Sequence, residues 1–276
     1  HWFHYTLCPM AQSFAFIGTG SMSGAILDGL LASGSEATIK ATTSTSTKQR
    51  DGVEARSLAT DSAANRWAAA GSDVVIIGVK PGMVLGVVAE IADVLEPGAL
   101  IISVAAGVTT ASIEKLVSVA VVRAMPNTPS LIGKGVTGLA TGSKASAANL
   151  AEARRLFEKV GFVVELPESQ IDALSTISGS GPAYVFHAIE KWTQAAIALG
   201  FNEKTASQLV EKTFAGATAL LEASGEAPAE LRRRVTSPKG TTERAIAVLD
   251  DAELEQVYLS AAKAALARAQ EMAGEN

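Results

Sequence analysis

A glycine-rich turn near the start of the chain has the residue types that bind phosphate. Gly18 and Gly20 follow the apolar run 14–17 and open a helical pattern. Gly18 permits a tight turn, and Gly20 lets the backbone approach a pyrophosphate at the helix start, where free N–H groups and the helix dipole favour an anion. This strand-first context predicts a dinucleotide site. The residues expected to line it are Gly18, Thr19, Gly20, Ser21 and Met22.

The turn departs from the usual pattern at its third glycine. Position 23 holds Ser23, and Gly24 comes next. Glycines of this kind also serve plain strand-to-helix turns, so the turn indicates a dinucleotide without indicating a reaction.

The choice of dinucleotide depends on the end of the second predicted strand, 38–42. A carboxylate there would hold the ribose 2′-hydroxyl of NAD. This chain has hydroxyls at Thr42 and Thr43, then Lys48 and Arg50, and no acid before Asp51. Hydroxyl donors with nearby cations suit a 2′-phosphate, so NADPH is preferred to NADH. The competing interpretation is a polar loop with solvated charges.

Composition excludes several other classes of protein. The 276 residues carry a net charge of −5, and the basic residues cluster only at 232–234, so a nucleic-acid partner is not expected. No apolar run is long enough to cross a membrane. The single cysteine, Cys8, suits a reducing cytosol and rules out thiolate metal clusters, and no metal site is expected. Met10 suits a natural start, so residues 1–9 are left out of the fold prediction.

The first half of the chain alternates short apolar strands with helical stretches. Strands are predicted at 14–17, 38–42, 74–79, 100–104, 119–124 and 161–165, and helices at 22–32 and 83–95. This alternation predicts parallel pairing through right-handed crossovers in a doubly wound, Rossmann-type sheet. We assign residues 10–169 to this dinucleotide-binding domain.

The second half is predicted to be entirely helical and is assigned as a domain of residues 170–276. Its helices are expected at 171–177, 182–199, 203–224, 227–235, 241–249 and 251–272. Their apolar content exceeds what one face needs, which predicts a subunit interface and hence a homo-oligomer.

Five further segments lie at strand or helix ends, where doubly wound folds bind ligands. Together they resemble the motifs of the pyrroline-5-carboxylate reductase family, in order and from Ala15 to about Gln270. The stretch 231–250 is the most diagnostic. The segments are Val79-Lys80-Pro81, Val104-Ala105-Ala106-Gly107, Met125-Pro126-Asn127-Thr128-Pro129, Ser178-Gly179-Ser180-Gly181-Pro182-Ala183-Tyr184 and Val235-Thr236-Ser237-Pro238-Lys239-Gly240-Thr241-Thr242.

That resemblance implies an oxidoreductase of amino-acid biosynthesis. Its reaction would be reduction of 1-pyrroline-5-carboxylate to L-proline by NAD(P)H, the last step of proline biosynthesis, in the cytoplasm. It also implies a homodimer with interlocked helical domains, in which one subunit completes the site of the other, and assembly of five dimers into a decamer.

The resemblance also implies roles for individual residues. The glycine turn, Thr43, Asn65, 79–81 and 104–106 would contact the dinucleotide, and Arg234 would reach it in the dimer. Asn65 lies 15 residues before Lys80, the spacing of an adenosine-side contact. The substrate carboxylate and ring would be held by Glu168, Ser237, Gly240, Thr241 and Thr242.

The implied chemistry agrees with the residues present. A cyclic imine arrives already protonated as an iminium, so a strong acid is not obligatory in a chain body whose one histidine is His187. Consecutive N–H groups at 240–242 begin a predicted helix and suit a carboxylate. The Thr242 hydroxyl is the best candidate for a hydrogen bond to the ring nitrogen, as proton donor or relay.

Each of these segments also has a purely structural explanation. The run 178–182 would serve as an interdomain linker, 237–240 as a turn, Lys80 as a solvated strand end, and His187 and Tyr184 as packed or surface residues. Two other functions compete with the reductase. One is a hydroxyacid dehydrogenase, disfavoured because 182–191 carries no early lysine; the other is a nucleotide-binding regulator without turnover.

Overall fold

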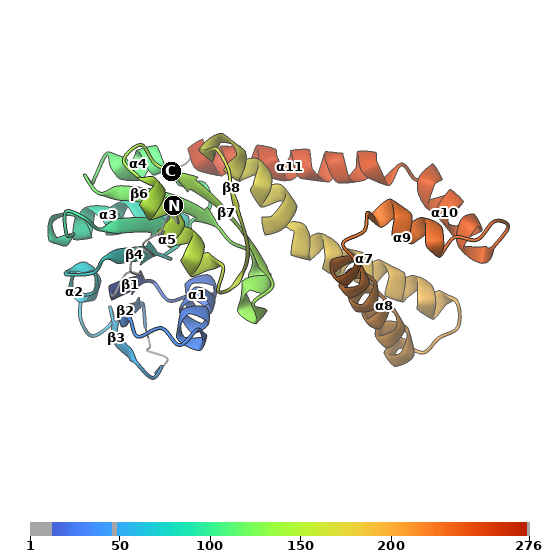
Figure 1. Cartoon of the computed structure of the whole chain (residues 1–276), viewed down its shortest axis with the longest axis horizontal. Helices are drawn as coiled ribbons and strands as arrows, with labels where there is room; N and C mark the ends of the chain where they lie inside the picture. The colour runs from blue at the N-terminus through green and yellow to red at the C-terminus, as the bar shows by residue number, and fades with distance from the viewer. Residues whose placement is uncertain (1–12, 46–48, 275–276) are drawn as a thin grey trace, which may run out of the picture. The chain divides into compact units, whose positions relative to one another are not determined.

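The computed structural model describes residues 13–45 and 49–274 (Figure 1). The described chain forms two compact units. One consists of the residues up to Ser180 together with those from Ala265 onward, and the other is Gly181–Ala264. Cys8, Met10 and Lys48, which entered the sequence analysis, lie outside the described residues.

The first unit is built on an eight-stranded sheet, counted over the described residues, in the order β3-β2-β1-β4-β5-β6-β7-β8. All six predicted strands are present, with ends shifted by no more than two residues. Two further strands, β3 and β7, were not predicted. The strands are β1 (Ser13–Ile17), β2 (Thr38–Thr43), β3 (Val53–Ser57), β4 (Val74–Ile77), β5 (Leu100–Ser103), β6 (Ala120–Met125), β7 (Gly135–Thr141) and β8 (Gly161–Glu165).

The predicted parallel pairing is wrong at one position in this sheet. β7 runs antiparallel to β6, with Arg123 opposite Ala140, whereas the other neighbouring strands are parallel. Only η3 (Thr128–Ile132) separates β6 from β7. This connection is too short for a parallel crossover, which needs a dozen or more residues, so the chain turns back on itself.

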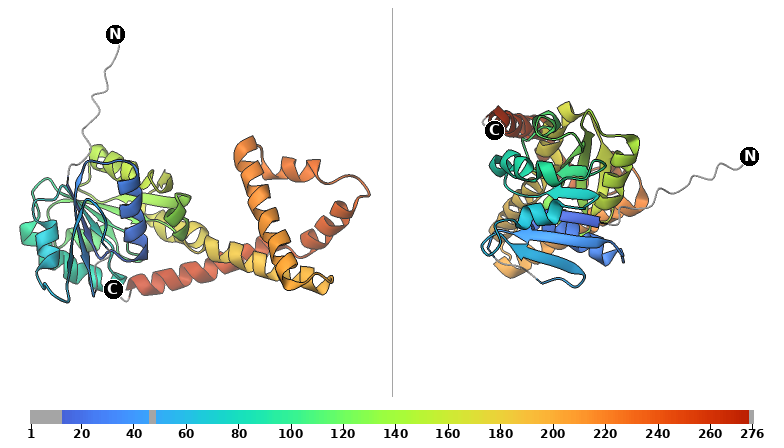
Figure 2. Two further views of the ribbon diagram at one scale, coloured as in Figure 1. Left: turned by 90° about the horizontal axis from the view of Figure 1, so that it is seen from below. Right: turned by 90° about the vertical axis from the view of Figure 1, so that its left-hand side faces the viewer.

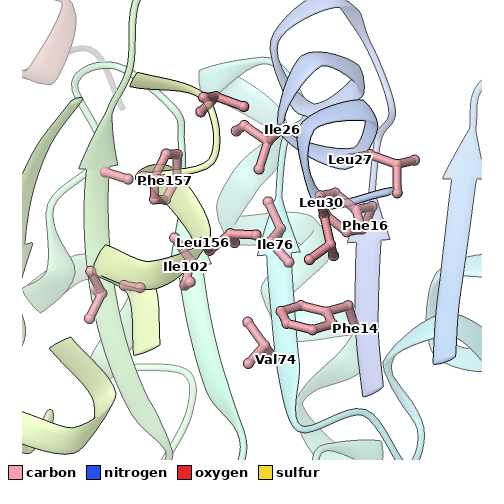
Figure 3. Packing of buried hydrophobic residues seen from close by; sticks show 14 of the residues in the cluster. Phe14, Phe16, Ile26, Leu27, Leu30, Val74, Ile76, Ile102, Leu156 and Phe157 are labelled. Carbon is pink, nitrogen blue, oxygen red and sulfur yellow. The ribbon is translucent and has the colours of Figure 1, made fainter. Parts of the chain in front are cut away.

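Helices cover both faces of the sheet (Figures 1 and 2). α1 (Ser21–Ala32) and α5 (Ala147–Phe157) pack on one face, as Figure 3 shows for Ile26, Leu27, Leu30, Leu156 and Phe157. The opposite face is covered by α2 (Ala64–Ala69), α3 (Val84–Ile91) and α4 (Thr110–Glu114). Short helical turns complete the unit: η1 (Pro81–Met83), η2 (Ala92–Val94), η4 (Glu168–Gln170), α6 (Ile171–Leu174) and η5 (Ser175–Gly179).

The first strand, β1, shows why the predicted strands of the sheet are continuous apolar runs in the sequence. Phe14 and Phe16 point to the α1 face, whereas Ala15 and Ile17 point to the α2 and α3 face, and all four are buried. Because each face is covered by helices, both sets of alternate residues must be apolar. Burial of each large side chain contributes about 1.5–3 kcal/mol.

The second unit is helical, as predicted. Asn202 caps α8, its side-chain oxygen accepting from the Thr205 N–H at 3.0 Å, and Gly225 ends that helix at φ 64°. Pro228 occupies the first turn of α9, as expected for a residue without an N–H. The helices are α7 (Gly181–Ala198), α8 (Glu203–Ser224), α9 (Pro228–Arg234), α10 (Thr241–Asp251) and α11 (Leu254–Gly274), whose last turns belong to the first unit.

Candidate active site

The strand order creates a crevice-forming switch point between β1 and β4. From β1 the chain adds β2 and β3 on one side, then returns to place β4 on the other. Ile17, Ile77 and Ser103, the last residues of β1, β4 and β5, are aligned across the sheet. Three segments predicted from the sequence therefore follow neighbouring strand ends: 18–22, 79–81 and 104–106. Ligands of doubly wound folds bind at this position.

The glycine turn is anchored to the end of β2. The Gly18 N–H donates to Thr42 Oγ1 at 3.1 Å, and the Thr19 N–H donates to the Thr42 carbonyl at 2.9 Å. Gly18 has φ +81°, and a Cβ at this residue would lie 2.7 Å from Val79 Cγ1. Both the backbone angle and the close contact require glycine. The N–H groups of Gly18 and Thr19 thus hold the turn in place and are not free for a ligand.

The start of α1 is open to an anion. Gly20 is the N-cap, no side chain caps the helix within the described chain, and its first turn contains no acid. A Cβ on Gly20 would meet no atom within 4 Å. The N–H groups of Gly20, Ser21 and Met22 therefore form a free, positively polarised helix end, which fits a pyrophosphate.

The missing third glycine is replaced by Gly78, which directly follows β4. Ser23 is buried, and a Cβ on Gly78 would overlap its hydroxyl oxygen and lie 2.7 Å from its Cβ. The usual third glycine allows close packing of helix against strand. Here Gly78, just past β4, supplies that space and Ser23 fills it. Gly24 then accommodates Arg50, whose Nη2 would lie 3.1 Å from a Cβ there.

The residues expected to contact a 2′-phosphate are Thr43, the last residue of β2, and Arg50, which lies between β2 and β3. Thr43 Oγ1 is covered and has no hydrogen-bond partner in the described chain. Arg50 is paired with Asp28 of α1, with Nε to Oδ1 at 2.5 Å and Nη2 to Oδ2 at 3.3 Å. No carboxylate follows β2 directly, which agrees with the sequence argument against a 2′-hydroxyl.

Asn65, predicted as an adenosine-side contact, is almost fully buried at the start of α2. Its Oδ1 accepts from Thr42 Oγ1 at 2.9 Å, and its Nδ2 donates to Glu90 Oε2 at 3.0 Å. Sequence reasoning did not find Glu90, because nothing in its local pattern distinguishes it from a solvated helix residue.

The other predicted cofactor segments lie beside the turn. Lys80 is exposed and precedes η1. Ala106 is exposed and, with Gly107 and Met125, lines a small cavity of about 60 Å³. The buried Arg123 and the partly exposed Asp172 border the same cavity.

Glu168, predicted to lie near the substrate ring, is held by hydrogen bonds within the first unit. Its Oε1 accepts from the Thr110 N–H at 2.7 Å, and its Oε2 accepts from the Thr110 hydroxyl at 2.6 Å. Arg123 Nη1 lies 3.7 Å from Glu168, and its Nη2 donates to Asp172 at 2.6 Å. This cluster ties β6 to the start of α4. The one feature of the sequence that could have indicated this cluster is Arg123, a charged residue inside an otherwise apolar predicted strand.

The predicted substrate loop precedes α10 in the second unit. The Gly240 N–H donates to the Ser237 carbonyl at 3.0 Å, and a Cβ on Gly240 would lie 2.9 Å from that oxygen. Lys239 takes φ 62°, and its N–H donates to Glu243 Oε2. Gly240 is the N-cap of α10 with no side-chain cap in the described chain. The loop therefore offers the helix-start N–H groups of Thr241 and Thr242 to an anion.

Arg234, predicted to reach the cofactor, is paired within its own unit. Its guanidinium donates to Glu226 and to Glu230. Hydrogen bonds from Arg233 and then Arg234 hold the pKa of Glu230 below its usual value.

The helices of the second unit carry far more apolar surface than their small core uses. That core consists of Ala196, Ala206 and Val210, with Ile189 and Phe214 against it. Large side chains that remain exposed include Phe186, Trp192, Leu220, Val257 and Tyr258. A surface of this kind is typical of an interface between subunits.

Two kinds of feature are absent from the described residues. No group of three or more His, Cys, Asp or Glu side chains there is arranged to hold a metal ion. No helix among these residues is both long and apolar enough to span a membrane.

Known proteins resemble both halves of the chain. Residues 168–272 match the family described as pyrroline-5-carboxylate reductase dimerisation, and residues 13–107 match that described as NADP oxidoreductase, coenzyme F420-dependent. A pyrroline-5-carboxylate reductase of Pseudomonas aeruginosa is 40% identical over 94% of this chain and 96% of its own length.

Solved structures agree with the sequence matches. A pyrroline-5-carboxylate reductase from Coxiella burnetii has a TM-score of 0.86 and 37% identity, covering 96% of this chain and 99% of that chain. The NADP-bound pyrroline carboxylate reductase of Plasmodium falciparum has a TM-score of 0.80 and 24% identity, over 95% of this chain and 98% of that chain, and shows the likeness in fold.

Proposed function

The chain belongs to the pyrroline-5-carboxylate reductase family and reduces 1-pyrroline-5-carboxylate to L-proline, and we propose that NADPH is its preferred hydride donor. The observation that carries the activity is 40% identity to a reductase of that name over almost the whole of both chains. The match of 168–272 to the family's dimerisation region supports assembly of this oxidoreductase into an oligomer.

The preference for NADPH rests on the absence of a carboxylate directly after β2. A 2′-phosphate needs donors and no nearby acid, and the last residue of β2 is Thr43, with Arg50 beyond it. The match of 13–107 to an NADP oxidoreductase family and the NADP in the Plasmodium falciparum structure support the same choice. NADH remains the alternative donor, used with a lower kcat/KM.

Binding of the dinucleotide is assigned to the three strand ends of the switch point. Its pyrophosphate would take the free N–H groups of Gly20 to Met22, while Val79–Pro81 and Val104–Ala106 would hold the nicotinamide side. When bound, NADPH supplies the hydride, so this chain's residues need only orient the imine carbon and exclude competing geometries.

Binding of the substrate is assigned to the loop before α10. Ser237, Gly240 and Thr241 would surround the carboxylate of the substrate, which needs donors rather than catalysis. Because the Gly240 N–H already donates to Ser237, the donors would be the N–H groups of Thr241 and Thr242. The Thr242 hydroxyl would hydrogen-bond the ring nitrogen, accepting from the N–H of the protonated imine and donating to the amine nitrogen after hydride transfer. Because the imine is basic enough to arrive protonated, Thr242 need not act as a strong acid. Glu168 would lie near the ring, steadied by Thr110.

The functional domains, assembly and location are proposed to follow the family. We assign 10–169 to the cofactor and 170–276 to dimerisation and substrate, with interlocked helical domains and five dimers in a cytoplasmic decamer. Arg234 would reach the cofactor of the partner subunit. The exposed apolar helices support the interface.

Light scattering on the protein as it elutes from a size-exclusion column tests the assembly. A dimer of constant mass at all concentrations would contradict the decamer.

Activity is tested by following NADPH absorbance with 1-pyrroline-5-carboxylate as substrate. We expect oxidation of NADPH to match formation of proline one to one, with a smaller kcat/KM for NADH. A well-folded preparation that binds NADPH without turnover would be a regulator. Reduction of a keto acid by NADPH in place of the imine would identify a hydroxyacid dehydrogenase.

A further inference from the structure

A chain of hydrogen bonds runs from the glycine turn to helix α3 of the first unit. The Gly18 N–H donates to Thr42 Oγ1 at 3.1 Å, that hydroxyl donates to Asn65 Oδ1 at 2.9 Å, and Asn65 Nδ2 donates to Glu90 Oε2 at 3.0 Å. The four groups come from the end of β1, from β2, from α2 and from α3. No two of them are neighbours in sequence.

The direction of this chain is determined by its last member. A carboxylate only accepts, so Asn65 must turn its Nδ2 toward Glu90 and its Oδ1 toward Thr42. The Thr42 hydrogen then points to Asn65, which leaves the oxygen of the hydroxyl to accept from Gly18. Every donor thus points toward Glu90, and bonds aligned in this way strengthen one another.

Burial of the two middle residues, Thr42 and Asn65, makes the loss of any of their hydrogen bonds costly. Thr42 is 0% exposed and Asn65 is 2% exposed, so water does not replace a lost partner. Removal of the Thr42 hydroxyl would leave both the Gly18 N–H and Asn65 Oδ1 without their partners. Buried polar groups in that condition are costly, and the backbone moves to relieve them.

Resting on the proposed binding of NADP(H) at the turn, we propose that Thr42 and Glu90 are positioning residues for the dinucleotide. Thr42 engages the N–H groups of Gly18 and Thr19, which leaves those of Gly20 to Met22 for the pyrophosphate. Glu90 sets the orientation of Asn65 and thereby of the Thr42 hydroxyl. It acts on the turn from the opposite end of the chain of bonds, through two intervening side chains.

The test compares Thr42→Val with Thr42→Ser in the full-length protein. Valine keeps the shape and removes the hydroxyl, whereas serine keeps the hydroxyl. We expect Thr42→Val to raise the Kd for NADP⁺ and the KM for NADPH about tenfold, equivalent to 1.4 kcal/mol. The KM for 1-pyrroline-5-carboxylate should stay unchanged, and Thr42→Ser should bind NADP⁺ within about threefold of wild type.

Glu90→Leu provides a second arm at the other end of the chain, in case Thr42→Val does not fold. It should also raise the Kd for NADP⁺ about tenfold, and Glu90→Gln, which can still accept, should have a smaller effect. Asp93→Asn is the matched control. Asp93, in η2, pairs with Arg66 of α2, whose Nη1 also donates to the Glu90 backbone carbonyl at 2.7 Å, whereas the Asp93 carboxylate bonds to none of the four groups of the chain.

Titration of NADP⁺ by calorimetry, with the melting temperature of every variant, separates the outcomes. Wild-type protein that neither binds NADP⁺ nor reduces the imine would overturn the proposed function itself. With a competent wild type, unchanged Kd in Thr42→Val and Glu90→Leu would overturn the positioning role. An equal loss in Thr42→Ser or in Asp93→Asn would also overturn it, because general loosening would then explain the effect.

Discussion

The close contact between Ser23 and Gly78 gives a prediction whose size follows from the structure. In Gly78→Ala the new Cβ would overlap the Ser23 hydroxyl and lie 2.7 Å from Ser23 Cβ and 2.8 Å from the Gly18 carbonyl oxygen. Overpacking a core costs about 1–3 kcal/mol, and contact with a backbone atom puts this case at about 3 kcal/mol. At about 2–4 °C per kcal/mol, the melting temperature should fall by roughly 6–12 °C.

Part of that loss should be recovered by a second change. Ser23→Gly removes the hydroxyl and Cβ that the new methyl group meets, although the Gly18 oxygen remains. We expect a coupling energy of about 1–2 kcal/mol between the two positions in a double-mutant cycle. The Kd for NADP⁺ should rise in Gly78→Ala, because Gly18 must shift.

The assay is thermal unfolding followed by circular dichroism for the wild type, both single variants and Ser23→Gly/Gly78→Ala. Strictly additive changes in melting temperature would refute the inference that Gly78 supplies the space of the missing third glycine. So would a Gly78→Ala variant as stable as wild type.

Three other changes test the rest of the site. Thr43→Asp should lower kcat/KM for NADPH at least about tenfold more than for NADH, since it sets an acid against a phosphate; steady-state kinetics with equal losses would contradict the 2′-phosphate assignment. Thr242→Ala should lower kcat about tenfold or more with the KM for NADPH unchanged, and an unaltered kcat would leave this residue a structural role only. Arg123→Met should destabilise the protein by about 3 kcal/mol in urea titrations, because it leaves Asp172 and Glu168 facing each other. Arg123→Met/Asp172→Leu should recover much of that loss, and a double variant no better than the single one would argue against the ion pair.

Much of the architecture could be predicted from local pattern. Apolar runs such as Val74–Ile77 in β4 are buried on both faces, so their composition alone distinguishes them from amphipathic helices. The helices of the second half had clear ends, as at Gly200, which follows α7 with φ 101°, and at Asn202, the N-cap of α8. β3 was missed because it lies at the edge of the sheet and has no continuous apolar run, its partly buried residues alternating with exposed ones.

Some features of the candidate site could likewise be predicted from the sequence, and others could not. Its glycines and the Thr-rich end of β2 were recognisable because their roles depend on backbone conformation and on residues close in sequence. The sequence did not show that the Gly18 and Thr19 N–H groups are already engaged by Thr42, nor that Glu168 is held by Thr110. Those partners are far apart along the chain.

The sequence by itself therefore determined the order of most elements, the glycine turn after the first strand and the family. Only the tertiary structure decided which N–H groups remain free at that turn, why Ser23 is tolerated opposite Gly78, and how Glu90 is connected to Gly18. The physical reason is that hydrophobic period and turn chemistry act over a few residues. Hydrogen bonds and close packing instead join side chains that the folded sheet brings together from distant positions.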